Sequence, residues 1–119
     1  MKKTVIYAKH ILYRQYEPTI KEQIKECEKF AKKNDYNVVA KFFDEKADKT
    51  IYCNAYDEMI DYCRHNKCSY IIMQFPMCLS RIRERTREII NNLSKENIKV
   101  IFTDLEHCSI FNLLKVVSK

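Results

Sequence analysis

Cationic, acidic and thiol side chains, which can bind ligands or take part in chemistry, follow three apolar stretches of this 119-residue chain. Lys9 and His10 come after the first stretch, Asp44 ends the second, and Cys78 and Arg81 lie shortly after the third. In an open parallel sheet, ligand sites lie at the carboxyl ends of the strands, so a site is expected among the loops after Ala8, Phe43 and Phe75. Lys9 and His10 equally fit the solvated start of a loop.

Alternating arginines extend the third group along an expected helix. On such a helix Arg81 and Arg85 share one flank. Intervening glutamates favour a salt-bridged solvent face for most of these arginines, with Arg81 at the helix start as the exception. The charged residues of this segment are Arg81, Arg83, Glu84, Arg85, Arg87 and Glu88.

Cysteine and histidine residues raise the question of a metal site. Cys63, His65 and Cys68 cluster in sequence, but the spacing C-x4-C is looser than the C-x2-C pairs of structural zinc sites. Cys63 is explained as helix core, so we expect no metal. The six cysteines are irregularly spaced within apolar patterns, which favours reduced, partly buried thiols.

Strand-like and helix-like segments alternate along the chain, which indicates a three-layer α/β fold with a mainly parallel four-stranded sheet. Strands are expected over residues 4–8, 36–43, 69–75 and 99–103. Thr19 and Glu22 form a capping box before the first helix, which should end near residues 33–35. Its apolar stripe contains Ile20, Ile24, Cys27, Phe30 and Ala31.

Two further helices are expected between the strands. Asn54 is a candidate N-cap for the second helix, and Ser80 is a candidate N-cap for a third helix over residues 81–95. A short helix can form over residues 109–118. The expected inward residues are Tyr56, Met59, Ile60 and Cys63 in the second helix and Ile82, Thr86, Ile89, Ile90 and Leu93 in the third.

Composition excludes several classes of function. With no glycine, the chain lacks the phosphate-binding loops of dinucleotide and nucleoside triphosphate sites, so no nucleotide cofactor is expected. No stretch has the length of a signal core or membrane span, which favours a cytoplasmic protein. The length fits one domain over residues 1–119, and the net charge of +6 favours polyanionic partners such as DNA.

Three passages together resemble the catalytic domain of serine recombinases of the resolvase/invertase type. They are residues 19–39 with the acidic strand end Phe43-Asp44-Glu45, the segment from Tyr70 to Arg81, and Asn97-Ile98-Lys99-Val100-Ile101-Phe102. The resemblance covers roughly residues 4–106. It implies a family whose serine attacks a DNA phosphodiester while arginines neutralise the transition state.

Several catalytic positions differ from this family pattern. The family's Tyr-Ala-Arg-Val-Ser corresponds to Tyr7-Ala8-Lys9-His10-Ile11, so Ile11 replaces the nucleophile and Lys9 replaces an arginine. The family's Asp-Arg-Leu-Ser-Arg corresponds to Met77-Cys78-Leu79-Ser80-Arg81, so Cys78 replaces another arginine and Arg81 is kept. A further arginine corresponds to about Cys53, whereas Gln23 and Asp44 are kept.

The resemblance therefore implies a recombinase-like domain without catalytic activity. It would act on a mobile element by binding DNA, through Lys9, His10, Arg81 and Arg85, or by binding a related recombinase or itself. The family's long dimerisation helix and separate DNA-binding domain are not expected. Two rivals are an active enzyme with a relocated nucleophile, such as Tyr7, Cys78 or Ser80, and a protein-binding module without a DNA role.

Overall fold

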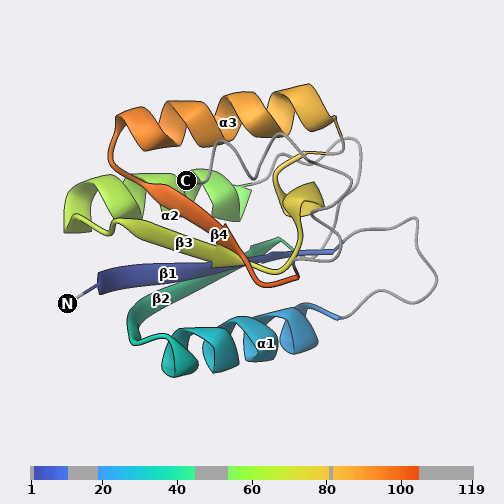
Figure 1. The fold of residues 1–119 in the computed structure, drawn as a ribbon, viewed down its shortest axis with the longest axis vertical. Coiled ribbons are helices and arrows are strands. Elements are labelled where there is room, and N and C mark those ends of the chain that lie inside the picture. The colour runs from blue at the N-terminus through green and yellow to red at the C-terminus, as the bar shows by residue number, and fades with distance from the viewer. Residues whose placement is uncertain (1, 11–18, 45–53, 81, 105–119) are drawn as a thin grey trace.

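The computed structural model describes residues 2–10, 19–44, 54–80 and 82–104, in which strands and helices alternate (Figure 1). Ile11, Cys53, Arg81 and the helix expected over residues 109–118 lie outside this part. The strands are β1 (Lys2–Lys9), β2 (Tyr36–Asp44), β3 (Tyr70–Met73) and β4 (Lys99–Phe102). The helices are α1 (Ile20–Lys33), α2 (Asn54–Asn66) and α3 (Arg83–Lys95), with a 3-10 turn η1 (Pro76–Cys78).

The strands form one parallel sheet in the order β2-β1-β3-β4. α1 covers one face, and α2 and α3 cover the other (Figure 1). Alternating side chains of β1 divide between the two cores: Val5 and Tyr7 pack on the α2 and α3 side, whereas Ile6 packs on the α1 side. The expected three-layer α/β fold is confirmed.

Local sequence signals account for the beginning of α1. The Thr19 hydroxyl accepts a hydrogen bond from the Glu22 N–H at 3.1 Å, and the Glu22 carboxylate accepts one from the Thr19 N–H at 2.9 Å. This is the expected capping box, and its hydrogen bonds lower the pKa of Glu22. Within the described residues, no helix is both long enough and apolar enough to cross a bilayer.

All three helices are followed by a non-glycine residue with positive φ. Asp35, Lys67 and Asn97 have φ values of 60°, 54° and 62°. After α2, the Cys68 N–H donates to the Cys63 carbonyl at 3.0 Å, the 6→1 bond of a Schellman motif. Glycine usually occupies this position, so a glycine-free chain holds three residues in a conformation that L-amino acids disfavour.

The start of α3 differs from the prediction. Ile82, expected to point inward, is 60% exposed because it is the extended N-cap residue and the helix begins at Arg83. Ser80 therefore is not the N-cap; its hydroxyl accepts from the Ile82 N–H at 3.0 Å. Asn54 is the first helical residue of α2 and not its N-cap. Thr86, Ile90 and Leu93 are buried as expected.

Candidate active site at the carboxyl edge of the sheet

The carboxyl ends of the parallel strands meet at one edge, where ligand sites of open α/β sheets lie. β1 brings Tyr7, Lys9 and His10 to this edge, and β2 brings Asp44. The turn after β3 adds Cys78, and the amino-terminal part of α1 adds Gln23. Of the expected site residues, Tyr7, Lys9, Gln23, Asp44 and Cys78 are connected by the hydrogen bonds described below.

Asp44 connects three elements at this edge. Its Oδ2 accepts a hydrogen bond from the Tyr7 hydroxyl at 2.6 Å. Its Oδ1 accepts from the Ala55 N–H at 3.1 Å, and Oδ2 accepts from the Tyr56 N–H at 3.3 Å. A carboxylate at the amino end of a helix satisfies unpaired N–H groups and opposes the helix dipole. Asp44 therefore caps α2 from a different element of the fold.

Gln23 holds the end of β1 in a second set of contacts. Its Nε2 donates to the Lys9 carbonyl at 2.9 Å, and its Oε1 accepts from the Lys9 N–H at 3.2 Å. The Cys78 thiol also donates to Gln23 Oε1 at 3.7 Å. Gln23 is 1% exposed, so this side chain joins α1, β1 and η1 from within the core. Gln23 and Asp44, both kept from the family pattern, thus have structural partners.

The cationic candidates are more open to solvent. Lys9 and His10 are half-buried, and the His10 N–H donates to the Asp44 carbonyl at 3.0 Å, which extends the β1–β2 ladder by one bond. Arg85 is exposed on the first turn of α3 and takes no part in the hydrogen bonds described above. The structure therefore brings Lys9 and His10 to the edge and leaves Arg85 on a separate helix surface.

Two of the three potential nucleophiles at this edge are enclosed. Tyr7 is 0% exposed and Cys78 is 2% exposed, whereas the half-buried Ser80 accepts a backbone hydrogen bond. Close by, burial raises the pKa of the Cys27 thiol to about 12, with a smaller contribution from Cys78. A protonated thiol is a poor nucleophile, so we expect Cys27 to react slowly at neutral pH.

Two polar residues at this edge were not anticipated. Gln74 and Thr103 directly follow β3 and β4, and the Thr103 N–H donates to the Met73 carbonyl at 3.0 Å. Gln74 Oε1 and Thr103 Oγ1 are buried without a hydrogen-bond partner within the described part of the chain. Their position immediately after apolar strands is the sequence signal that could have identified them.

The metal-site candidates have local structural roles. Cys63 and Cys68 are buried neighbours in the Schellman motif after α2, and burial raises the pKa of Cys63 to about 12. His65 is exposed, with Nδ1 at 2.8 Å from the Asp61 carbonyl oxygen. Cys27, Cys63, Cys68 and Cys78 are free thiols, as expected. In residues 2–10, 19–44, 54–80 and 82–104, no three metal-ligating side chains gather.

Solved structures share this fold at low sequence identity. The N-terminal catalytic domain of TP901-1 integrase has a TM-score of 0.72 and 19% identity, over 98% of this chain and 93% of that one. The C-terminal catalytic domain of ISC1926 TnpA, an IS607-like serine recombinase, has a TM-score of 0.71 and 16% identity, over 96% and 78%. A resolvase family site-specific recombinase from Streptococcus pneumoniae has a TM-score of 0.70 and 15% identity, over 98% and 85%.

Comparison with curated proteins gives no match. The family described as "Resolvase, N terminal domain" matches residues 13–112, which is most of the chain. This match begins after Ile11, so the correspondence of residues 7–11 rests on the sequence resemblance alone. The matched length and the shared fold agree with the resemblance seen in the sequence. The chain therefore belongs to the resolvase family of serine recombinases, and it matches the N-terminal domain of that family.

Proposed function

We propose that this domain does not cut DNA and acts in recombination, or in its regulation, by binding DNA or a related recombinase on a mobile element. The observation that carries the proposal is the enclosure of the remaining polar site residues. The Tyr7 hydroxyl and the Asp44 carboxylate bond to each other, and Gln23 bonds to the backbone of Lys9. These groups stabilise the fold at the position where the family resemblance implies chemistry.

Loss of the nucleophile supports the same proposal. Ile11 stands at the position that corresponds to the attacking serine, and an alkyl side chain cannot attack phosphorus. Lys9 and Cys78 stand where arginines are expected, and neither has the forked guanidinium that contacts two phosphate oxygens. Transition-state stabilisation at phosphorus depends on such positioned cations.

Relocation of the nucleophile would require buried groups to move. Tyr7 and Cys78 are almost fully buried, and phosphoryl transfer needs the attacking atom aligned with phosphorus at about 3–3.5 Å. Exposing Tyr7 would break its hydrogen bond to Asp44. The relocated-nucleophile alternative is therefore disfavoured, and it makes the opposite prediction in the cleavage test below.

DNA contact at the carboxyl edge is the binding part of the proposal. Lys9 and His10 are half-buried at this edge, and Arg85 is exposed on the separate surface of α3. Arg81, which lies outside the described residues, is included from the family resemblance alone. The net charge of +6 favours a polyanionic partner. Binding through phosphates would weaken steeply with salt. A protein-binding module without a DNA role would show weak DNA affinity with little salt dependence.

A cleavage assay tests the catalytic part. The protein is incubated with supercoiled plasmid, the reaction is quenched with denaturant, and nicked DNA and covalent protein–DNA adducts are measured by gel and mass spectrometry. An active serine recombinase serves as the positive control. We expect neither nicking nor adduct. An adduct would refute the proposal, and the modified residue would identify the nucleophile.

A restoration variant tests the assignment of the lost site. The combined substitutions Ile11→Ser, Lys9→Arg and Cys78→Arg return the three family residue types. Because Cys78 is buried, circular dichroism must first show that this variant folds, and Ile11→Ser with Lys9→Arg serves as a milder version. If the wild-type protein cleaves DNA as well as either folded variant does, the site has been assigned to the wrong residues.

A further inference from the structure

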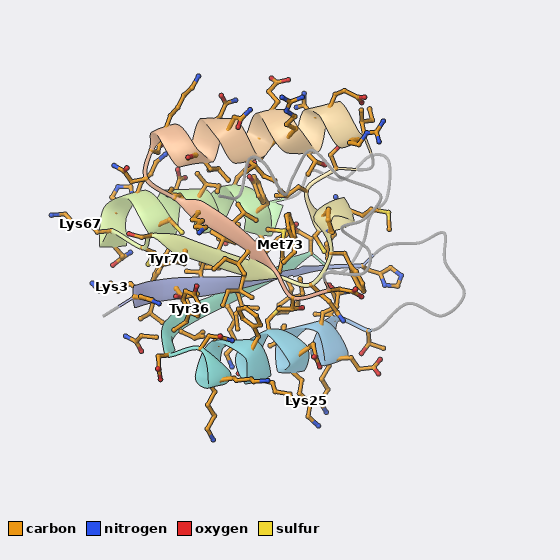
Figure 2. The ribbon with its side chains drawn as sticks, viewed as in Figure 1. Lys3, Lys25, Tyr36, Lys67, Tyr70 and Met73 are labelled. Atoms are coloured by element: carbon orange, nitrogen blue, oxygen red, sulfur yellow. The ribbon has the colours of Figure 1, made fainter. Side chains whose placement is uncertain are left out.

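Basic side chains gather at the amino edge of the sheet, opposite the candidate site. In the parallel sheet, Lys2 of β1 pairs with Tyr36 at the start of β2, and Tyr70 at the start of β3 pairs with Lys99 at the start of β4. Figure 2 shows Lys3, Lys67, Tyr36 and Tyr70 at this one end of the molecule. We define the amino-edge patch as Lys2, Lys3, Tyr36, Lys67, Tyr70 and Lys99.

The four lysines of the patch are exposed, and no acidic side chain in the described part of the chain forms an ion pair with them. Ion pairs within the described residues join Lys41 to Glu28 and Arg64 to Asp61 and Glu96, and none includes a patch lysine. Asp61 and Glu96 are thus paired with Arg64. Asp35 directly precedes Tyr36 and offsets one charge, so the four lysines leave this edge with a net positive charge.

Backbone geometry presents these lysines on a rigid frame. Lys3 Nζ donates to the Asn66 carbonyl at the end of α2 at 3.4 Å, which directs that side chain towards Lys67 and its neighbours. Lys67 occupies the positive-φ position after α2, and Lys99 begins β4. From β1 to β4 the row spans two strand spacings, about 10 Å, which is similar to the major-groove width of about 12 Å.

The aromatic rings of the patch are packed and not open for base stacking. Tyr36 stacks on Phe30 with ring centroids 6.2 Å apart, meets the Tyr70 ring edge-on at 5.1 Å, and has Lys2 Nζ 4.7 Å from its centroid. Both sides of the Tyr36 ring are thus in use. Recognition at this surface would depend on phosphate charge and not on exposed bases.

We infer that the amino-edge patch docks the phosphate backbone of duplex DNA without sequence preference, at a surface separate from Lys9 and His10. The inference rests on the proposed function and goes beyond it by adding a second DNA-binding surface to the one proposed at the carboxyl edge. Anionic membranes are a poorer fit, because amphipathic surfaces that bind bilayers insert apolar side chains. The large apolar side chains that are exposed in the described part are Val39, Phe43 and Ile82, and none belongs to the patch.

A matched pair of charge variants tests the inference. The patch variant carries Lys3→Gln, Lys67→Gln and Lys99→Gln. The control variant carries Lys21→Gln, Lys25→Gln and Lys29→Gln on the exposed side of α1 and loses the same charge. Binding to a random-sequence 30-base-pair duplex is measured by fluorescence anisotropy from 50 to 200 mM KCl, and circular dichroism checks that each variant folds.

The expected result is a smaller salt dependence in the patch variant only. Each lost phosphate contact reduces the slope of log K against log salt by about 0.9, so three contacts reduce it by about 2.7. Between 50 and 200 mM KCl, the wild-type affinity should therefore fall about 40-fold further than that of the patch variant. A Lys→Arg version at the same three positions should retain the wild-type slope.

Other outcomes overturn the inference in distinguishable ways. Equal weakening in the patch and control variants would show that net charge alone drives binding. If the patch variant binds the duplex with the same affinity and salt dependence as the wild type, only the amino-edge location is refuted. Absence of salt-dependent duplex binding in the wild type would also remove the DNA-binding part of the proposed function. Lysine-dependent binding to phosphatidylserine vesicles without duplex binding would identify a membrane surface instead.

Discussion

Replacing Asp44 with alanine should destabilise the protein strongly, although the family resemblance places Asp44 at a catalytic edge. The side chain accepts hydrogen bonds from the Tyr7 hydroxyl at 2.6 Å and from two N–H groups at the start of α2, those of Ala55 and Tyr56. Alanine removes all three hydrogen bonds at once. A residue kept only for chemistry would have little effect on stability.

The expected magnitude follows from these contacts. A hydrogen bond to a charged group contributes about 1.5–3 kcal/mol, and loss of a helix cap costs about 1 kcal/mol. Asp44→Ala should therefore lower the free energy of unfolding by about 3 kcal/mol. For a chain of this size, about 4 °C per kcal/mol gives a fall in Tm of about 12 °C. Asp44→Asn keeps one acceptor oxygen and should cost less.

Urea denaturation and thermal melts of a double-mutant cycle would test this account. The cycle contains Asp44→Ala, Tyr7→Phe and the double variant, and the coupling free energy between the two side chains should be about 1.5–3 kcal/mol. Glu58→Ala, an exposed carboxylate on the same helix α2, is the matched control and should change stability by less than about 0.5 kcal/mol. A fall in Tm below about 3 °C for Asp44→Ala, or coupling near zero, would refute the structural role.

Three further predictions concern a helix end, two carboxylates and two thiols. Lys67→Gly should raise the free energy of unfolding by about 0.5–1 kcal/mol in urea titrations, because glycine relieves the positive φ; a loss of stability would contradict this. Hydrogen bonds from Thr19 and Arg64 lower the pKa values of Glu22 and Glu96, so their stabilisation is present above about pH 4.5 and lost as pH falls through the lowered values. Glu22→Gln with Glu96→Gln should flatten the decline in stability from pH 5 to pH 3 measured by chemical denaturation, and an unchanged decline would argue against these contacts. The pKa values of about 12 predict that Cys27 and Cys63 resist iodoacetamide at pH 8 until the protein unfolds, whereas labelling of the native protein, mapped by mass spectrometry, would show exposure or activation.

The element order could be predicted because local signals agree with the tertiary fold. The Thr19 and Glu22 capping box marks the start of α1, and the apolar run at β3 indicates a strand buried on both faces; Ile71, Ile72 and Met73 are indeed buried. Helical periodicity wrongly predicted an inward Ile82, because the pattern holds only for residues within the helix and Ile82 precedes it. There the chain is still extended, and the side chain points into solvent.

The site was harder to predict than the fold because its contacts join distant segments. Gln23 and Asp44 were assigned from family resemblance, but nothing near Asp44 in sequence indicates that it caps a helix starting ten residues later. Likewise, Gln23 can be buried because its side-chain amide forms two hydrogen bonds with the backbone of Lys9. The sequence near Gln23 does not indicate this partner. Periodicity and propensity describe short segments and carry no information about such partners.

The central position of β1 also affects how the chain can be synthesised. β1 leaves the ribosome before the other three described strands, yet it needs β2 on one side and β3 on the other. The β3 residue Tyr70, which pairs with Thr4, lies 66 residues later in the chain. Pairing with β2 through α1 can occur early, but the other edge of β1 waits until β3 has emerged. During that interval the unpaired backbone N–H and C=O groups of β1, around its apolar residues Val5, Ile6 and Tyr7, are available to other nascent chains, so chaperones that shield this edge should assist co-translational folding.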